Sequence, residues 1–439
     1  MSRLGIYVDA VFHVDAGDKP RVRVDPVDYA FLLFAAEVGE RFDRLVLFGR
    51  TRTGVAPPDS VPLNGVELVR LPHYDSLRDF RGMVRAARGT LRGLLRGLSA
   101  VDAVWVLGPH PYGFALIGLA LLRGKRVVLG VRQDTVDYYR NRLPTRRSRP
   151  LLGAVWTMDG LYRLLARRLR TTVVGERLAR RYGGERGRVL TMNVSLVRAA
   201  DVVSSPAARD WGGTIHLLSV GRLEPEKNPL LLVDALALLE VQHPGRYRLT
   251  WIGQGRLRAE VVERAMVLHV EHVIELRGFV PHGPALLELY RSAHIFVHVS
   301  LTEGVPQVLF EALASGTPIV ATDVGGVRTA LDDGAAALLI EPRNADALAA
   351  AVRTLTDDAE LRDRLVGRGL ELAARASLEA ESERVARFIA NDPAQGGNRR
   401  LRRPLARRGV GRRSLPEAPP GRPKPPNGLL VGPRVIRPL

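Results

Sequence analysis

Runs of Val, Ile and Leu bounded by Gly alternate with helix-forming stretches along most of this 439-residue chain. Uninterrupted apolar runs of this kind are typical of strands that are buried on both faces of a parallel sheet and covered by helices. The pattern therefore predicts an α/β fold. The expected strands are 4–12, 44–49, 66–71, 103–108, 126–131 and 171–175, and then 215–221, 248–253, 273–279, 295–300, 318–322 and 336–341.

The two series of strands predict two Rossmann-like domains facing a cleft. We expect an N-terminal, acceptor-side domain over residues 1–205, a linker over 206–214 and a C-terminal, donor-side domain over 215–392. Ligands of such sheets bind beyond the carboxyl ends of the strands. Residues that directly follow a strand are therefore the candidates for a site.

Residues 393–439 differ from the rest of the chain in charge and composition. They hold twelve Arg or Lys and one acid, so they carry +11 of the net charge of +19. With many prolines and little apolar periodicity, this Arg/Pro-rich tail is expected to be disordered. Arginine-rich segments bind phosphate polymers nonspecifically, but no aromatic residues for base stacking are interleaved here, so we expect no specific nucleic acid partner.

The chain contains no Cys, which excludes disulfides, thiolate nucleophiles and Cys metal sites. Its first residues lack the basic and apolar regions of a signal peptide. No uncharged apolar run reaches the roughly 18 residues of a membrane-spanning helix. We therefore expect a cytoplasmic protein.

Five arginines in residues 81–98 recur at intervals of four, three, four and four, which places them on one face of a helix. Four glycines in the same stretch disfavour that helix. Further basic clusters occupy 139–150 and 161–170. Together the three clusters predict peripheral docking on an anionic membrane surface, and an ordinary solvated face is the alternative.

Two cations follow the predicted strand 215–221. Arg222 and Lys227 bracket an acidic turn before the next helix, in "SVGRLEPEKNPLLLVDAL". The forked guanidinium of Arg, the mobile charge of Lys and the N-terminus of a helix together suit a diphosphate. A pair of surface charges in a loop is the alternative.

Two carboxylates follow the predicted strand 295–300, in "LTEGVPQVLFEALASG". Glu303 precedes a helix whose first position suits Pro306 and whose free N–H groups can hold an anion. Glu303 can accept hydrogen bonds from sugar hydroxyls, and Glu311, about two turns along the helix, from a ribose diol. The alternative is an ordinary amphipathic helix. His298, inside the preceding strand, is expected to be a packing residue.

These stretches, with "RGFV" at 277–280 and "TPIVATDVGG" ending at 326, resemble the donor half of the family-four retaining glycosyltransferases of GT-B fold. The resemblance covers roughly residues 215–390. It implies transfer of a sugar, with retention at the anomeric carbon, from a nucleotide-diphosphate sugar to a glycan or lipid-linked acceptor in polysaccharide or glycolipid biosynthesis. It also implies that neither a metal nor another cofactor is needed.

The resemblance further implies roles for single residues. Arg222 and Lys227 would hold the donor diphosphate, Glu303 the transferred sugar and Glu311 the ribose. The first three would be catalytic because they stabilise charge on the leaving diphosphate or contact the reacting sugar. Gly325 and Gly326 would let a ligand approach the backbone. The remaining donor-binding residues would be Gly253, Gly278, Phe279, Val280, Gly304, Val305, Pro306, Gln307 and Val308.

The acceptor half departs from the pattern of the family. Only Gly17 stands where many relatives have a Gly-rich loop, and Arg132, Gln133 and Asp134 stand where many have a histidine. Asp134 is the candidate catalytic base and Gln133 a candidate sugar contact. His110, which follows the strand 103–108, is a candidate acceptor contact.

Two other functions stay open at this point. A nucleotide-sugar epimerase or hydrolase can share the same two-domain form, and analysis of products with and without acceptor distinguishes it. A non-catalytic scaffold that binds sugar nucleotides is also conceivable because the histidine is missing. Binding of a nucleoside diphosphate without turnover would favour the scaffold.

Overall fold

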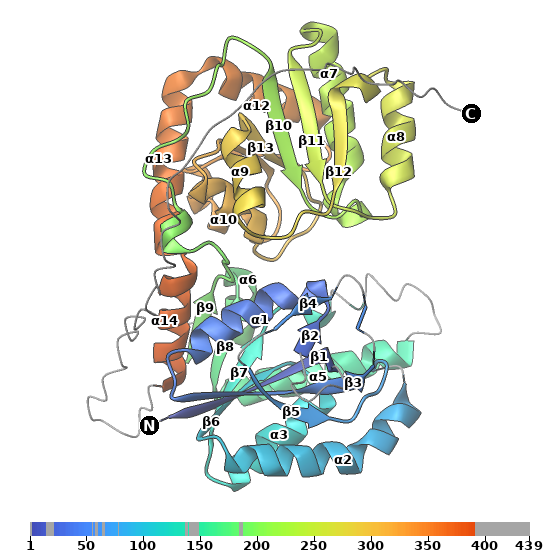
Figure 1. The fold of residues 1–439 in the computed structure, drawn as a ribbon, viewed down its shortest axis with the longest axis vertical. Coiled ribbons are helices and arrows are strands. Elements are labelled where there is room, and N and C mark those ends of the chain that lie inside the picture. Colours follow the sequence, from blue (N-terminus) through green and yellow to red (C-terminus); the bar gives the residue numbers. More distant parts are fainter. Residues whose placement is uncertain are drawn as a thin grey trace, which may run out of the picture. The chain divides into compact units, whose positions relative to one another are not determined.

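The structure is a computed structural model that describes residues 2–14, 22–54, 56–57, 60–63, 66–77, 79–136, 139, 149–183 and 188–390. The tail 393–439, Gly17 and most of the basic cluster at 139–150 lie outside the described residues. The α/β fold is confirmed, with two mainly parallel sheets (Figure 1). Among the described residues, no helix is both long and apolar enough to span a bilayer.

The first sheet is built from residues of the N-terminal half, and helices follow most of its strands. The strands are β1 (Arg3–Val14), β2 (Val22–Val24), β3 (Arg44–Thr53), β4 (Val61–Pro62), β5 (Glu67–Leu71), β6 (Ala103–Leu107), β7 (Arg126–Val131), β8 (Arg170–Val174) and β9 (Val189–Met192). The helices are α1 (Pro26–Gly39), α2 (Phe80–Ser99), α3 (Pro111–Leu122), α5 (Arg149–Ala166) and α6 (Glu176–Tyr182).

The second sheet is parallel throughout and repeats the alternation of strand and helix. Its strands are β10 (Ile215–Val220), β11 (Tyr247–Ile252), β12 (Ile274–Gly278), β13 (Ile295–His298), β14 (Ile319–Thr322) and β15 (Leu338–Ile340). Its helices are α7 (Pro229–Gln242), α8 (Arg258–Val267), α9 (Pro284–Ser292), α10 (Gln307–Ala314), α11 (Val327–Ala330), α12 (Ala345–Asp357) and α13 (Ala359–Arg375). The last described helix is α14 (Leu378–Ala390).

Both sheets contain a topological switch point. In the second sheet the chain runs from β10 to β11 and β12 on one side, and then returns to place β13 on the other side of β10. In the first sheet it runs from β1 to β3 and β5, and then places β6 on the other side of β1. Ligands of open α/β sheets bind at such points, beyond the carboxyl ends of the two diverging strands.

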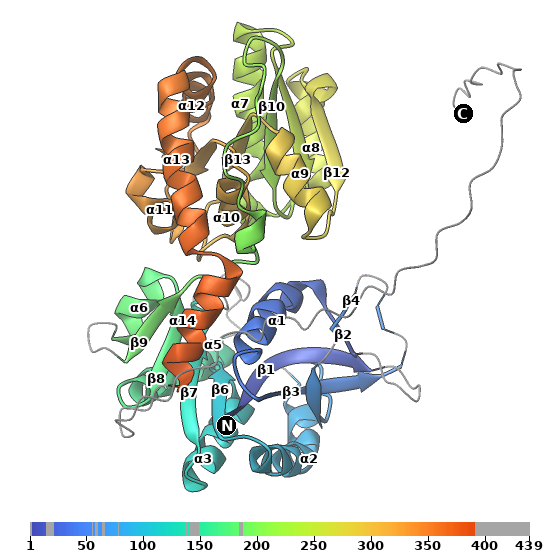
Figure 2. The same cartoon turned by 60° about the vertical axis from the view of Figure 1, so that its left-hand side comes forward.

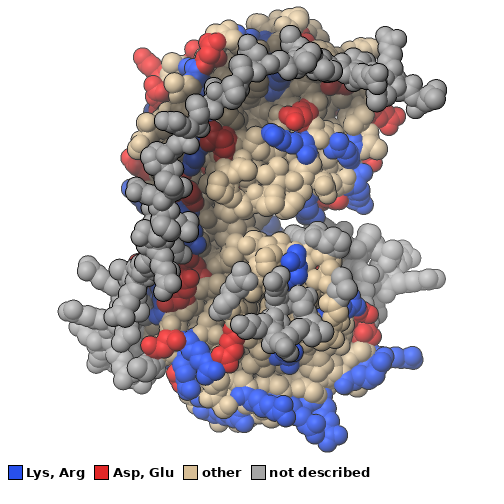
Figure 3. Space-filling view, viewed as in Figure 1, with Lys and Arg blue, Asp and Glu red and all other residues tan. Residues whose placement is uncertain are grey.

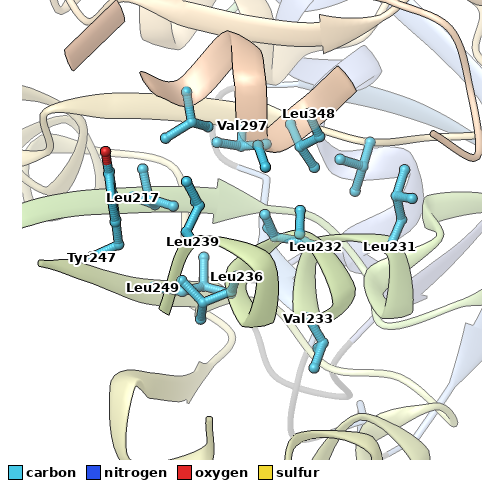
Figure 4. Packing of buried hydrophobic residues seen from close by; sticks show 14 of the residues in the cluster. Leu217, Leu231, Leu232, Val233, Leu236, Leu239, Tyr247, Leu249, Val297 and Leu348 are labelled. Carbon is cyan, nitrogen blue, oxygen red and sulfur yellow. The ribbon is translucent and has the colours of Figure 1, made fainter. Parts of the chain in front are cut away.

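The central strands, such as β6, β7, β13 and β14, bury both of their faces, which explains the uninterrupted apolar runs. In β6, Ala103, Trp105 and Leu107 face one core, and Val104 and Val106 face another. Successive side chains of a strand point to opposite faces, so a sheet covered twice needs apolar residues at every position. Figure 4 shows the equivalent layer on the second sheet, where leucines of α7 pack against β10 and β11.

The prediction for residues 81–98 is confirmed, because α2 forms in spite of its glycines. The glycines allow the helix to approach the sheet closely. A Cβ on Gly97 would lie only 2.2 Å from the Phe48 ring. Close packing here therefore compensates for the lower helix propensity of glycine.

The chain returns to the first sheet at its C-terminal end. Leu378, Val385 and Ile389 of α14 belong to the same buried cluster as residues of β1 and α1 (Figure 2). The sequence predicts a C-terminal domain over 215–392. The packing of α14 shows that the last residues of that range contact the first sheet.

Candidate active site

Two predicted site residues, Lys227 and Glu303, meet at the switch point of the second sheet. Lys227 ends a short 3-10 turn (Pro225–Lys227) after β10, and Glu303 follows β13. The ammonium of Lys227 pairs with Oε1 of Glu303. Ser300 Oγ donates to the same oxygen at 2.6 Å, and His298 Nε2 lies 3.3 Å from it. One carboxylate oxygen is thus held by three neighbours.

Glu303 is ionised in this setting. Burial by itself raises the pKa of the carboxyl, but the neighbouring His298 and the charge of Lys227 outweigh it and lower the pKa to about 2. A buried carboxylate of this kind keeps its charge and its geometry at neutral pH. It can therefore accept hydrogen bonds from neutral hydroxyl groups.

The backbone around Glu303 is fixed by its neighbours in the fold. The Leu301 N–H donates to the Glu226 carbonyl at 2.8 Å, which ties the two loops of the site together. Gly325 has a φ of 56°, and a Cβ there would lie 1.9 Å from the Glu303 carbonyl oxygen. The chain's own backbone therefore requires a glycine at this position, and the approach of a ligand to Gly325 stays a prediction.

Glu311 lies in α10 and is only 5% exposed. Tyr290 Oη donates to its Oε2 at 2.8 Å, and His282 Nδ1 lies 3.1 Å from its Oε1. Burial alone would lower the pKa of His282, but the bond to Glu311 raises it. Burial and the charge of Glu311 raise the pKa of Tyr290 well above its usual value. Glu311 is thus an oriented carboxylate, and its role toward a ribose stays a prediction.

The other predicted donor residues surround this pair. Arg222 is mostly exposed and pairs with Glu226 at 2.8 Å, so its guanidinium is accessible. The N–H of Gly253 donates to the carbonyl of Gly278 at 2.7 Å, which brings the two predicted base-binding loops together, and Phe279 beside them is exposed. Gly304, Val305, Pro306, Gln307 and Val308 form the connection from β13 into α10, where Pro306 precedes the first helical residue instead of occupying it.

The predicted acceptor-side residues do not form a single cluster. Arg181 bridges Asp134, at 2.6 Å, and Asp159, at 2.8 Å. Gln133 is exposed. His110 is 3% exposed and is bonded to Tyr7 of β1 and to Tyr74 in the loop after β5. The roles of these residues at an acceptor stay predictions.

Sequence reasoning missed the residues that hold the two glutamates. His298 was expected to pack, and the structure does stack it on Phe296, but it also places its Nε2 next to Glu303. His298 and Ser300 are two residues apart at the end of a strand, so they share a side. That spacing is a signal for His298. Tyr290 and His282 carry no such signal, because they reach Glu311 from another helix and a loop.

Comparisons with known proteins find a family match for the region of the second sheet. A family model described as "Glycosyl transferases group 1" matches residues 209–371. A D-inositol 3-phosphate glycosyltransferase of Pseudarthrobacter chlorophenolicus is 32% identical over 268 residues, which cover 60% of this chain. That aligned part spans 62% of the relative, which is less than two thirds of its length.

Solved structures share the fold at low identity. A sucrose-phosphate synthase of Thermosynechococcus elongatus has a TM-score of 0.62 at 17% identity, over 88% of this chain and 98% of that one. HepE of Anabaena, solved with UDP and glucose, has a TM-score of 0.60 at 15% identity, over 89% of this chain and 99% of that one.

The sequence resemblance is thereby confirmed at the level of family and fold. The matched segment contains the switch point with Lys227 and Glu303, and the shared fold extends over both sheets. Residues 209–371 thus match the Glycosyl transferases group 1 family, and the fold of the chain is GT-B.

Proposed function

We propose that the protein transfers a sugar from a nucleoside-diphosphate sugar to a hydroxyl-bearing glycan or lipid-linked acceptor. The observation that carries this proposal is the pairing of Lys227 with Glu303 at the switch point of the second sheet. A cation suits the diphosphate and a carboxylate suits the sugar hydroxyls, and both groups follow adjacent strands. The UDP and glucose named in the HepE structure agree with such a donor.

The proposed reaction retains the configuration at the anomeric carbon. The bond between the anomeric carbon and the β-phosphate oxygen breaks, and a glycosidic bond forms on the same face. The acceptor hydroxyl gives its proton to the leaving phosphate. Lys227 and Arg222 stabilise the charge that develops on the diphosphate, and Glu303 orients the sugar. No step requires a metal or another cofactor.

The acceptor is proposed by class only. The relative of Pseudarthrobacter chlorophenolicus is named for D-inositol 3-phosphate, which makes that compound the first acceptor to test. Asp134, the candidate base in the sequence, is paired with Arg181, so we give proton acceptance to the leaving phosphate instead.

We also propose that the protein works in the cytoplasm, at the surface of an anionic membrane. The exposed side of α2 carries Arg81, Arg85, Arg88, Arg92 and Arg96. Phe80 and Val84 are exposed on the same helix, at 73% and 58%. Figure 3 shows Lys and Arg side chains gathered along the lower border, where Figure 1 places α2. Arginines interleaved with exposed apolar side chains suit a bilayer interface.

A ligand screen followed by product analysis tests the proposal. Thermal shifts are measured with UDP, GDP and ADP, and then with their sugar forms. The preferred sugar nucleotide is incubated with and without D-inositol 3-phosphate, in buffer containing EDTA, and the products are analysed by NMR. We expect a glycoside with the donor's anomeric configuration. Release of free sugar only would favour a hydrolase, isomerised donor an epimerase, and binding without turnover a scaffold.

A further inference from the structure

The switch point of the first sheet carries a second polar group, which the proposed donor site does not use. Asp9 lies in β1 beyond the last residue of β1 that pairs with β6, which is Tyr7. The pairing of β1 with β3 is interrupted between Tyr7 and Val11, so Asp9 lies in a bulge. Bulges redirect side chains and are frequent next to functional sites.

A buried network of hydrogen bonds runs from His110 through Tyr74 to Asp9. The Tyr112 N–H donates to Nδ1 of His110 at 3.2 Å, so Nδ1 carries no proton. Burial lowers the pKa of His110 and keeps the ring neutral, and the ring proton therefore resides on Nε2. Nε2 lies 3.0 Å from Tyr74 Oη, which in turn donates to Asp9 Oδ1 at 2.8 Å. Tyr7 Oη lies 2.8 Å from Nδ1.

Arg50 completes the support. Its Nε lies 2.9 Å from Asp9 Oδ1, and its guanidinium stacks 4.3 Å above the ring of Tyr74. Tyr74, Arg50 and His110 are all buried, whereas the side chain of Asp9 is 29% exposed. Asp9 Oδ2 lies 3.5 Å from His110 Nε2. The network therefore fixes Oδ1 and leaves Oδ2 as its accessible atom.

The charge around Asp9 suits hydroxyl groups better than phosphate. Asp28, in the first turn of α1, pairs with Arg132 at 3.2 Å. Burial raises the pKa of Asp28, Arg132 opposes that effect, and the charge of Asp9 adds to it, so the two carboxylates are close enough to interact. Arg50 and Arg132 are each paired with one of these carboxylates, which leaves little positive charge for an anion, and each carboxylate can accept hydrogen bonds from neutral hydroxyls.

We propose that Asp9 is an acceptor-binding residue whose Oδ2 accepts a hydrogen bond from a hydroxyl group of a polyol acceptor. Tyr74, Arg50 and His110 are positioning residues that act through Asp9. This proposal rests on the glycosyl transfer proposed above. It adds that the acceptor places hydroxyls, and not a phosphate, at the switch point of the first sheet.

The test compares Asp9→Asn with a matched control, Asp102→Asn. Asp102 also pairs with an arginine, Arg3 at 2.8 Å, and its side chain is 33% exposed. It precedes β6, so it lies at the amino ends of the strands, on the side of the sheet opposite to Asp9. With D-inositol 3-phosphate as acceptor, we expect Asp9→Asn to raise the acceptor KM about tenfold, the size expected for a hydrogen bond to a charged group. The donor KM and the rate of donor hydrolysis without acceptor should stay within about twofold of wild type, and Asp102→Asn should leave the acceptor KM unchanged.

A second variant and a binding measurement keep the test decisive. Tyr74→Phe releases Oδ1 of Asp9 without removing the carboxylate, so we expect a smaller rise in the acceptor KM. Saturation-transfer NMR with UDP present follows the binding of myo-inositol and D-inositol 3-phosphate directly. Signals that persist in Asp102→Asn and disappear in Asp9→Asn support the subsite.

The outcomes separate this inference from the proposed function. An unchanged acceptor KM in Asp9→Asn, with wild-type transfer intact, overturns the subsite alone. If wild type transfers no sugar, the proposed function fails, and the NMR comparison still decides the subsite. The subsite is overturned if Asp9→Asn and wild type give equal NMR signals, or if wild type gives no signal.

Discussion

The two sheets have the same strand order around their switch points but build the polar groups there in different ways. In the second sheet, Lys227 and Glu303 come from loops that directly follow β10 and β13. In the first sheet, Asp9 lies inside β1 and is held by Arg50, Tyr74 and His110 from three other segments. A site built from loops after strands can be recognised in the sequence as a local motif. A site built from single residues that are far apart in the sequence cannot.

The largest expected effect concerns the pair in the second sheet. Glu303→Gln removes the charge opposite Lys227 and, with it, the proposed acceptor of the sugar hydroxyls. We expect kcat/KM for the nucleotide sugar to fall on the order of 10²–10³-fold, as for other preorganised charge contacts. Glu275→Gln is the control, because Glu275 is exposed on β12 of the same sheet. A fall in kcat/KM of only a few-fold, or an equal fall in Glu275→Gln, would show that Glu303 does not act on the donor.

The same pair predicts a sensitivity to acid. The folded-state pKa of Glu303, about 2, is below its ordinary value of 4.5, so its contribution to stability is complete above the ordinary value and disappears as the pH falls toward 2. Wild type should lose about 3 kcal/mol more of its unfolding free energy than Glu303→Gln over this range. Urea unfolding of both proteins at pH 6 and pH 3 measures most of the difference. Parallel pH profiles would contradict the lowered pKa.

A third prediction concerns α2, a basic face that belongs to the first sheet. Arg85→Ala combined with Arg92→Ala should weaken binding to vesicles of phosphatidylserine and phosphatidylcholine by about 2 kcal/mol, since each arginine near an anionic surface contributes roughly 1 kcal/mol. Sedimentation with vesicles measures the partition coefficient. The matched control exchanges Arg248 and Arg277, which are exposed on β11 and β12 of the second sheet, for Ala. Equal loss in both double variants would show that general charge, and not α2, governs binding.

The smallest expected effect compares two tyrosine–carboxylate pairs. Tyr290 donates to the buried Glu311 and Tyr74 to the partly exposed Asp9, each at 2.8 Å. Tyr290→Phe should cost about 2 kcal/mol of unfolding free energy, and Tyr74→Phe about 1 kcal/mol, because water can replace the lost donor only at Asp9. Urea unfolding of the two variants gives the difference. If Tyr74→Phe cost more unfolding free energy than Tyr290→Phe, the assignment of Asp9 as the accessible carboxylate would be wrong.

Most of the fold was predictable from the sequence, because strands that are buried on both faces consist of uninterrupted runs of Val, Ile and Leu. The run 126–131 coincides with β7, and the other predicted strands differ from the observed ones only at their ends. The short strands β2, β4 and β9 were missed. Val22–Val24 and Val61–Pro62 are three and two residues long. β2 pairs with β1 and β4 pairs with β2, so neither strand depends on a sequence pattern of its own.

The candidate site was predictable where function depends on residues near each other in the sequence. Lys227 and Glu303 were predicted because each lies in the loop after a strand, and the structure pairs them. The acceptor side was not predictable in this way. Asp9 is a single polar residue within an apolar run, and only the bulge in β1 and the approach of Tyr74, 65 residues later, distinguish it.

The central claim is that Lys227 holds the diphosphate of the donor at the switch point of the second sheet. Calorimetry of Lys227→Ala with the nucleoside diphosphate that wild type prefers tests it most directly, with the turnover of the matching nucleotide sugar measured on the same preparation. We predict that the variant keeps the circular dichroism spectrum of wild type, binds the diphosphate about 100-fold more weakly and shows no measurable transfer, because a charge-assisted contact is lost. Near-normal diphosphate affinity and turnover in the folded variant would contradict the claim.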